Sequence, residues 1–437
     1  MKSHEKKELL TKGNAGKALI YCADISGHRH LYAAYFIRFY LEHGYEVFFC
    51  YAGRITRHLP DGSKRYEPTE SPYLDIYKEG NRVHLRNICH ELNNTKSEAN
   101  LIRDIQSEVK ADLSMFVDGD ILRWIFLGQL LPWRPRLVGR NFCVICLSEF
   151  IYSRGSMIKA LRELILFIKK FFTNRADLAG RGLFVRKFPL LTKCLWRNLS
   201  RFKLFNTAFC LDPGLVKHYN SKRILFLPEL ITRDLNARIT TQKSEFNKKV
   251  ERRYRDFLAK HKDKHILLMF GDLEPRKGYD LLLQLAASEP GCVCIRFGRT
   301  KSNYSPTWEA ILSKEKLIVE ERIFEHDIYI DSQELKDFIF STVKFIVLPY
   351  RRHYRSSSLL VDFLHRGFPV LTINRGAMAN IVKSYGVGRL FREGEFKSLL
   401  EEFLVFKNDY KNYLENIEKF KQAFSKESID KVLSVTL

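Results

Sequence analysis

The hydrophobic pattern at the start of the chain alternates between short apolar runs and longer runs with helical spacing. Residues 17–24 (KALIYCAD) form a short apolar run, residues 25–30 (ISGHRH) a turn with a glycine, and residues 31–44 (LYAAYFIRFYLEHG) a helical segment. Residues 45–53 (YEVFFCYAG) are again apolar and of strand length. This order predicts a β-α-β unit.

The same alternation continues to about residue 230. Further strands are predicted in residues 111–120 (ADLSMFVDGD), 136–148 (RLVGRNFCVICLS), 206–212 (NTAFCLD) and 223–230 (RILFLPEL). Strands that alternate with helices indicate a parallel sheet covered by helices on both faces.

A second alternation begins at residue 265, after a polar, highly charged stretch that leads into a predicted surface helix. The predicted organisation is therefore an α/β fold of two doubly wound, Rossmann-like domains that face a central cleft. The N-terminal domain spans residues 1–235, with a basic amphipathic insertion at about 156–205. A linker follows at 236–264, then a C-terminal domain at 265–410 and a C-terminal helix at 411–437.

The chain of 437 residues carries a formal net charge of +23, which favours a polyanionic partner. Residues 156–205 alone contain twelve Lys or Arg against two acidic residues. Their helical spacing predicts an amphipathic helix for an anionic membrane surface, or equally a domain helix with a solvated basic face. No nucleic-acid motif accompanies the charge, so we do not expect nucleic acid as a partner.

Cysteine usage and the absence of apolar segments of membrane length indicate the compartment. The nine cysteines are scattered through apolar runs, which predicts free thiols in a reducing compartment. Cys143 and Cys146 have the spacing of zinc ligands but lack a second pair, so we predict no metal site. With no secretory signal or membrane span in the pattern, we expect a cytoplasmic protein, peripheral on the inner face of the plasma membrane.

Hydroxyls and positive charges gather before one predicted helix. Residues 349–371 (PYRRHYRSSSLLVDFLHRGFPVL) place arginines and three serines ahead of an apolar helical run. Backbone N–H groups at a helix start lack partners within the helix and hold anions well. Ser356, Ser357 or Ser358 caps the helix, or the amides near Ser358 and Leu359 bind a phosphate.

A second phosphate-binding candidate follows the strand at residues 265–270. In FGDLEPRKGYD, Gly271 ends the strand, while Lys277 and Gly278 precede the next helix. Lys277 supplies a point charge and Gly278 lets the backbone approach a ligand; an ordinary surface turn is the alternative.

The order of these motifs resembles the C-terminal domain of the group 1 family of GT-B glycosyltransferases. Gly271, Leu273, Lys277 and Gly278 match its G-R-L-x3-K-G motif, although Asp272 replaces the arginine. Asp362 matches the later glutamate of its E-x7-E motif, and Tyr354 stands at the earlier one. The resemblance implies a donor site that comprises Gly271, Arg276, Lys277, Arg299, Tyr354, Ser356, Ser357, Ser358, Leu359 and Asp362, with Arg276 or Arg299 in place of the missing arginine.

The resemblance also places the acceptor side in the N-terminal domain. Gly27 and His30 are candidate acceptor-binding residues, and His28, Asp118 and Asp120 are candidate catalytic residues that orient the acceptor hydroxyl or stabilise oxocarbenium-like charge. A solvated loop for the histidines and a turn-forming DGD for the aspartates are the alternatives.

The implied activity is transfer of a hexose, with retention of configuration, from a nucleotide-diphosphate sugar to a cell-envelope glycan or lipid-linked acceptor. Neither a metal nor another cofactor is expected. The alternative is a non-catalytic nucleotide-sugar or glycan-binding module, because the family arginine and first glutamate are missing.

Overall fold

A computed structural model describes residues 15–25, 29–58, 64–67, 82–94, 98–117, 136–145, 205–230, 245–330 and 332–437. The chain divides into two compact units. Unit 1 comprises Met1–Leu230 together with Lys426–Leu437, and unit 2 comprises Ile231–Ser425.

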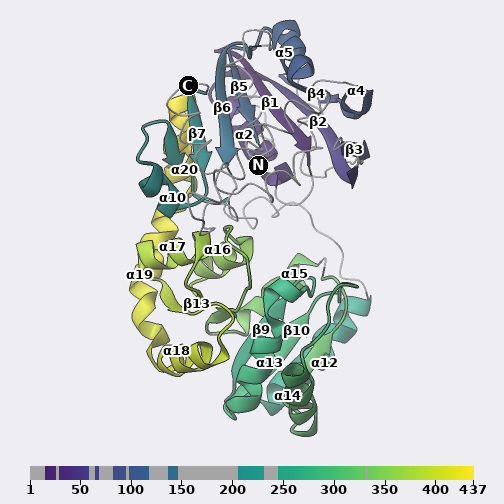
Figure 1. The fold of residues 1–437 in the computed structure, drawn as a ribbon, viewed down its shortest axis with the longest axis vertical. Coiled ribbons are helices and arrows are strands. Elements are labelled where there is room, and N and C mark those ends of the chain that lie inside the picture. Colours follow the sequence, from purple (N-terminus) through teal and green to yellow (C-terminus); the bar gives the residue numbers. More distant parts are fainter. Residues whose placement is uncertain are drawn as a thin grey trace, which may run out of the picture. The chain divides into compact units, whose positions relative to one another are not determined.

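Unit 1 is built on a sheet of parallel strands (Figure 1). Its strands are β1 (Gly16–Asp24), β2 (Tyr45–His58), β3 (Lys64–Glu67), β4 (Val83–Asn87), β5 (Leu113–Phe116), β6 (Arg140–Ile145), β7 (Thr207–Cys210) and β8 (Ile224–Phe226). The parallel strands run in the order β4-β2-β1-β5-β6-β7-β8, and β3 pairs antiparallel with the end of β2. This order, which reverses direction at β1, is that of a doubly wound fold.

The predicted β-α-β unit at the N-terminus is confirmed. It consists of β1, α2 (Arg29–Glu42) and β2, with Gly16 opposite Tyr45 in the parallel register. Side chains of β1 alternate between two cores: Leu19 and Tyr21 pack on one face of the sheet, Ala18 and Ile20 on the other. Burial on both faces explains why β1 is a continuous apolar run in the sequence.

The other described helices of unit 1 lie on both faces of the sheet. They are α4 (Cys89–Asn94), α5 (Glu98–Val109), α10 (Pro213–Tyr219) and α20 (Lys426–Leu433), followed by the 3-10 turn η3 (Ser434–Thr436). Local sequence defines α10 clearly: Asp212 accepts a hydrogen bond from the Gly214 amide, Pro213 occupies the first turn, and Asn220 ends the helix in the left-handed conformation.

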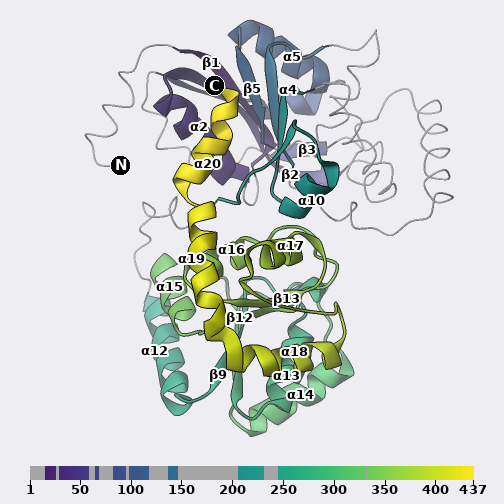
Figure 2. The ribbon, with the colours of Figure 1, turned by 90° about the vertical axis from the view of Figure 1, so that its left-hand side faces the viewer.

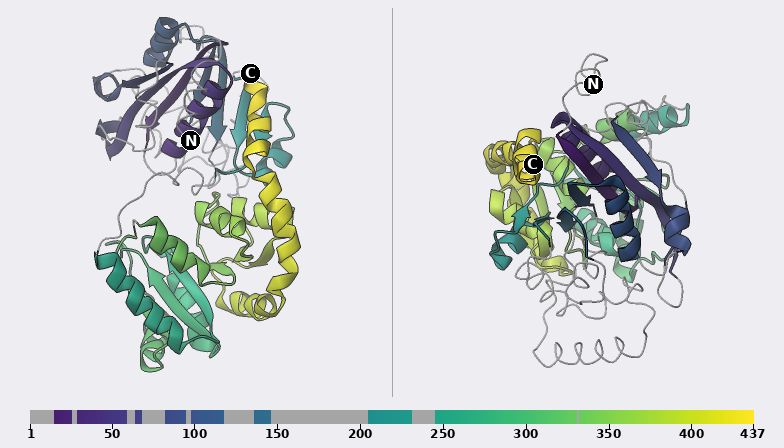
Figure 3. Two further views of the ribbon diagram at one scale, coloured as in Figure 1. Left: turned by 180° about the vertical axis from the view of Figure 1, so that it is seen from behind. Right: turned by 90° about the horizontal axis from the view of Figure 1, so that it is seen from above.

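The last helix of the chain belongs to unit 1, although the residues before it belong to unit 2. Figures 2 and 3 show α20 beside α2. The Tyr35 hydroxyl donates to Asp430 over 2.8 Å, and the Tyr40 hydroxyl donates to Thr436 Oγ1 over 3.1 Å. Ile429 and Leu433 are buried in the same core as α2. The segment predicted as one C-terminal helix is thus divided between the units, because its end buries apolar side chains on α2.

Unit 2 contains two three-stranded parallel sheets, β11-β10-β9 and β12-β13-β14. The strands are β9 (His265–Phe270), β10 (Cys292–Phe297), β11 (Ile323–His326), β12 (Ile346–Leu348), β13 (Val370–Ile373) and β14 (Gly388–Phe391). β9 lies beside β12, so the strands follow the order β11-β10-β9-β12-β13-β14. This is again a doubly wound order, with its switch point between β9 and β12.

The described helices and 3-10 turns of unit 2 precede, connect or follow these strands (Figures 1 and 3). They are α12 (Glu245–Lys260), η1 (Pro275–Lys277), α13 (Tyr279–Ser288), α14 (Trp308–Val319), α15 (Gln333–Ser341), α16 (Ser358–His365), α17 (Gly376–Tyr385), α18 (Phe396–Asp409), η2 (Tyr410–Tyr413) and α19 (Leu414–Ala423). The helix predicted after the polar stretch is α12, and it lies within residues 236–264.

Three predictions concern the basic segment, membrane-spanning helices and the cysteines. The basic segment of residues 156–205 lies outside the described residues. Within the part of the chain that the structure describes, no helix combines the length and apolar character needed to cross a membrane. Seven cysteines fall there, and all seven are buried: Cys22, Cys50, Cys89, Cys143, Cys210, Cys292 and Cys294.

Candidate functional site

The loop after β9 brings a lysine back over the end of the strand. Lys277 Nζ donates to the carbonyl oxygen of Phe270 over 2.9 Å, and a Cβ at Gly271 would lie 2.9 Å from the same Nζ. Burial, with a smaller contribution from the Arg276 charge, lowers the pKa of Lys277 to about 8. At pH 7 the ammonium is therefore mostly protonated but poorly solvated, which makes a bound anion favourable.

Glycines allow this loop to contact the loop after β12. Gly278 has a φ of 66°, and a Cβ there would lie 1.9 Å from the carbonyl oxygen of Pro349. The Arg351 amide donates to the Arg276 carbonyl over 2.6 Å. The two loops at the carboxyl ends of β9 and β12 are thereby joined at the switch point, where doubly wound sheets bind ligands.

The start of α16 lies at the end of the β12 loop. Ser357 is the residue before the first helical turn, but its side chain makes no capping hydrogen bond. Its hydroxyl instead interacts with the buried Tyr350. The first amides of α16 therefore have neither an intrahelical acceptor nor a hydroxyl cap from Ser357, which favours the anion-binding interpretation over capping by that residue.

His353 lies among the charged residues of the two loops. Arg276 Nη1 donates to His353 Nδ1 over 3.1 Å, and the His353 ring meets Tyr350 edge-on with centroids 5.0 Å apart. Burial, followed by the charges of Arg276 and Arg355, lowers the pKa of His353 to about 3. The imidazole is neutral at physiological pH, and because Nδ1 accepts from Arg276, its proton resides on Nε2.

Further contacts hold the β12 loop in place. Arg351 forms an ion pair with Asp280 in the first turn of α13, and Asp280 is only 4% exposed. The Tyr354 carbonyl accepts from the Ala377 amide over 2.8 Å, and a Cβ at Gly376 would lie 2.5 Å from Tyr354 Cα. The loop from Pro349 to Ser357 is thus fixed by α13 and α17.

Two predicted donor-site residues, Asp362 and Arg299, form ion pairs with other side chains of the protein. Asp362 is buried within α16 and accepts from Arg366 Nε over 3.0 Å, with Lys336 Nζ 3.6 Å away. Arg299 is paired with Asp272, the residue that replaces the family arginine, over 3.2 Å. The other arginine considered as its replacement, Arg276, is paired with Glu274 over 2.7 Å and lies beside His353.

Asp272 is itself held by two cations. Burial raises the pKa of this carboxyl, but hydrogen bonds from Lys301 and Arg299 outweigh that effect and lower it overall. Lys301 Nζ lies 2.9 Å from Asp272 Oδ2. An ionised Asp272 therefore neutralises positive charge at the rim of the candidate site.

On the acceptor side, only His30 lies within the described residues, and Gly27, His28, Asp118 and Asp120 do not. His30 is in the first turn of α2, with Nδ1 3.3 Å from the Ile25 carbonyl oxygen. Burial lowers its pKa, so the ring is neutral at pH 7. Next to it, Arg29 is paired with Asp24 at the end of β1, 2.7 Å apart.

Sequence reasoning did not single out Tyr350, Asp280 or Arg375. Tyr350 forms a hydrogen bond with the Ser357 hydroxyl, and Asp280 forms an ion pair with Arg351. The Arg375 guanidinium lies 5.2 Å from the centre of the Tyr354 ring. An acidic residue just after the Lys-Gly pair was a visible signal for Asp280. The partners of Tyr350 and Arg375 depend on contacts that the sequence does not display.

Among the described side chains, no group of three or more His, Cys, Asp or Glu is arranged to hold a metal ion.

Known proteins were compared with the chain by sequence and by structure. No family model matches the sequence, and no curated protein matches it. HepE from Anabaena, solved in complex with UDP, is similar in structure with a TM-score of 0.59 and 12% identity, covering 96% of this chain and 99% of HepE. Sucrose-phosphate synthase from Thermosynechococcus elongatus has a TM-score of 0.56 and 12% identity, with 96% and 97% covered.

A glycosyltransferase from Rickettsia africae gives the same TM-score of 0.56 at 12% identity, with 98% of each chain covered. At such identities the likeness shows the fold alone. The fold is GT-B, an α/β architecture of two Rossmann-like domains, as predicted from the sequence.

Proposed function

We propose that the protein is a glycosyltransferase that moves a sugar from a nucleotide-diphosphate donor to a cell-envelope glycan or lipid-linked acceptor. The observation that carries this proposal is that the start of α16 lies in the same loop cluster as Lys277, at the switch point of unit 2. Amides at a helix start and a poorly solvated ammonium together suit a diphosphate.

The proposed chemistry places the diphosphate where negative charge develops. When the bond between the donor sugar and the diphosphate breaks, the leaving group gains charge. The amides of α16 and Lys277 stabilise that charge more than they stabilise the intact donor, which lowers the barrier. Arg276, which is paired with Glu274 over 2.7 Å, lies beside His353, and the neutral His353 adds no charge.

Structural neighbours support the donor class. HepE has been solved with UDP and with UDP and glucose, and MnaA from S. aureus with UDP. We propose a nucleotide-diphosphate sugar as the donor, with retention of configuration and no requirement for metal. In unit 1, Gly27 and His30 would bind the acceptor, while His28, Asp118 and Asp120 would act at the reacting centre.

The acceptor proposal rests on neighbours and on charge. WaaG is described as a glycosyltransferase of lipopolysaccharide biosynthesis, and WaaB as a lipopolysaccharide outer-core galactosyltransferase. The basic segment of residues 156–205 suits the anionic inner face of the plasma membrane. Flotation with anionic liposomes tests this location: the full chain should float, and a variant lacking residues 156–205 should stay at the bottom. Equal flotation of both would contradict it.

The donor site is tested by calorimetry with UDP. We expect Lys277→Gln to weaken UDP binding roughly tenfold or more, because it removes a charge-assisted contact with phosphate. Lys316→Gln is the matched control, since Lys316 also donates to a backbone carbonyl, that of Ala287, over 2.8 Å, but on α14. Equal affinities for both variants would argue against the proposed site.

The second candidate function is non-catalytic binding of a nucleotide sugar or glycan. It is favoured by Asp272, which replaces the family arginine and pairs with Arg299, and by Tyr354 at the place of the first glutamate. Release of UDP from a panel of UDP-sugars, measured with and without glycan acceptors, separates the two functions. UDP binding without any turnover across the panel would favour the binding module.

A further inference from the structure

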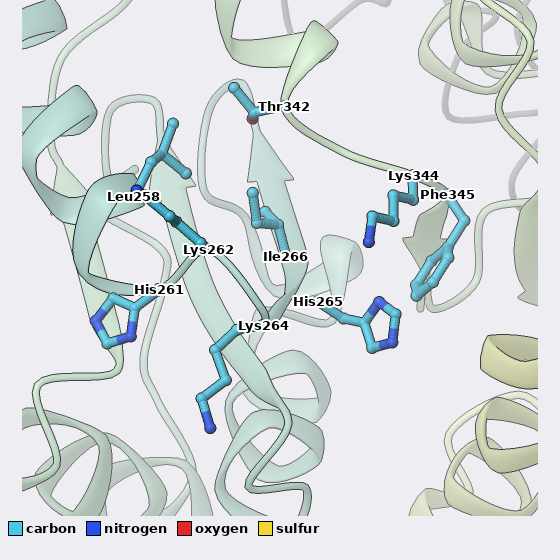
Figure 4. Close-up of a pocket in the computed structure, with 9 residues that line it drawn as sticks. All are labelled: Leu258, His261, Lys262, Lys264, His265, Ile266, Thr342, Lys344 and Phe345. Carbon is cyan, nitrogen blue, oxygen red and sulfur yellow. The ribbon is translucent and has the colours of Figure 1, made fainter.

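Unit 2 has a second basic site at the opposite edge of its sheet. A cavity of about 240 Å³ lies where α12 ends, β9 begins and the chain enters β12. Lys262, Lys264 and Lys344 line it, together with the apolar side chains of Leu258, Ile266 and Phe345 (Figure 4). The cavity is thus at the amino ends of β9 and β12, whereas the proposed donor site is at their carboxyl ends.

Two of the three lysines make no ion pair or hydrogen bond with any residue that the structure describes. These are Lys262 and Lys344, both exposed. Lys264 Nζ donates to the Pro290 carbonyl over 2.8 Å. Figure 4 shows Lys344 directed toward Ile266 and His265. None of the residues that line the cavity is acidic, so its positive charge is not balanced from within.

The negative carboxyl ends of two helices offset only part of the positive charge of the lysines. α12 and α15 both end near the cavity, and each carboxyl end carries roughly half a negative charge. These two ends offset about one of the three lysine charges and leave about two. A phosphate monoester carries a charge of about −1.5 to −2 at pH 7, which matches the remainder.

Two aromatic rings line one side of the cavity. The His265 ring lies against Phe345 with centroids 5.4 Å apart, and its Nδ1 is buried without a hydrogen-bond partner among the described residues. Burial, then the charges of Lys344 and Lys407, lowers the pKa of His265, so the ring is neutral at pH 7.

We propose that this cavity binds the phosphate monoester group of a small ligand, through Lys262 and Lys344 with Lys264 nearby. The monoester belongs either to a free phosphorylated metabolite or to a lipid head group. The proposal is independent of the function assigned to the carboxyl edge of the sheet.

Calorimetry of the full chain with glycerol 3-phosphate tests the proposal for a free ligand. The double variant Lys262→Gln/Lys344→Gln should bind at least roughly tenfold more weakly than the unsubstituted chain. Lys397→Gln is the control, because Lys397 is a highly exposed lysine of α18. Lys277→Gln should also retain binding, which separates this site from the proposed donor site. Unchanged binding in the double variant, or loss only in Lys277→Gln, would overturn the proposal.

Vesicle sedimentation tests the lipid source. Phosphatidic acid presents a monoester, whereas phosphatidylglycerol presents a diester. If the monoester belongs to a lipid, the chain sediments more with phosphatidic acid than with phosphatidylglycerol, and the double variant loses that difference while its circular dichroism is unchanged. Absence of binding to glycerol 3-phosphate, together with equal sedimentation on both lipids, would refute the proposal.

Discussion

At the residue scale, the chemistry of the candidate site depends on how burial changes the charge of individual groups. Lys277 keeps its charge at neutral pH, although burial lowers its pKa to about 8. His353, in the same loop cluster, is neutral because burial and the nearby arginines lower its pKa to about 3. Positive charge at the switch point is therefore supplied by lysine and arginine, while the histidine supplies hydrogen bonding.

The lowered pKa of Lys277 predicts proton uptake when a diphosphate binds. A bound anion favours the ammonium and raises the pKa of Lys277, so binding at pH 8.5 should take up a proton, whereas binding at pH 6.5 should not. UDP affinity should also fall as the pH rises through 8. Calorimetry in two buffers of different ionisation enthalpy measures the uptake, and Lys277→Gln should abolish it. Identical heats in both buffers at pH 8.5 would contradict the prediction.

The lysine has a different effect on folding. Its folded pKa lies below the ordinary value of 10.5, so its charge opposes folding below pH 8. That penalty is relieved between about pH 8 and pH 10.5 as the folded state, and then the unfolded chain, loses the proton.

At the element scale, close contact between two strand-to-helix loops builds the site. Gly278 allows the β9 loop to touch Pro349 at the end of β12, and the Arg351 amide then reaches the Arg276 carbonyl. Helices α13 and α16 both begin at this edge of the sheet. A side chain at Gly278 would separate the two loops and so displace the start of α16 from Lys277.

Alanine substitutions at three glycines of unit 2 distinguish the cost of a steric clash from the cost of backbone strain. Gly278→Ala should lower the free energy of unfolding by roughly 3 kcal/mol, because it combines a left-handed φ with a backbone clash. Gly394→Ala, with a φ of 78° and open space, should cost about 1 kcal/mol. Gly291→Ala has neither problem and should change stability by less than about 0.5 kcal/mol. Urea denaturation measures all three, and equal losses for Gly278 and Gly394 would refute the clash.

At the scale of the whole molecule, the chain returns to unit 1 after completing unit 2. Lys426–Leu437 belongs to unit 1, where α20 packs against α2. Lys426 also pairs with Glu42 at the end of α2 over 3.2 Å. Unit 1 is therefore completed by the last residues of the chain, and loss of that segment would expose part of its core.

Two neighbouring residues test the contribution of this segment. Leu433 is fully buried, whereas Val435 is 50% exposed. Leu433→Ala should destabilise unit 1 by about 2–5 kcal/mol, and Val435→Ala should change it by less than about 0.5 kcal/mol. Hydrogen exchange of the β1 amides reports on unit 1 directly. Similar protection of β1 in both variants would show that α20 contributes little.

The sequence predicted the two alternations of strands and helices because strands buried on both faces are continuous apolar runs, as β1 is. It also proposed Lys277, Gly278 and the serines before α16 as candidate site residues, since glycine, lysine and hydroxyl side chains near helix starts have a local physical meaning. These features depend on residues a few positions apart, so they are visible along the chain.

Other features were decided only by tertiary structure. Ser357 interacts with Tyr350 instead of capping α16, Asp362 is paired with Arg366 and Lys336, and α20 belongs to unit 1. Lys336 and Asp362 lie on different helices, and α2 and α20 are separated by almost the whole chain. A local pattern fixes which element forms, but the partner of a buried polar group or of an apolar helix face is set by which distant segments fold beside it.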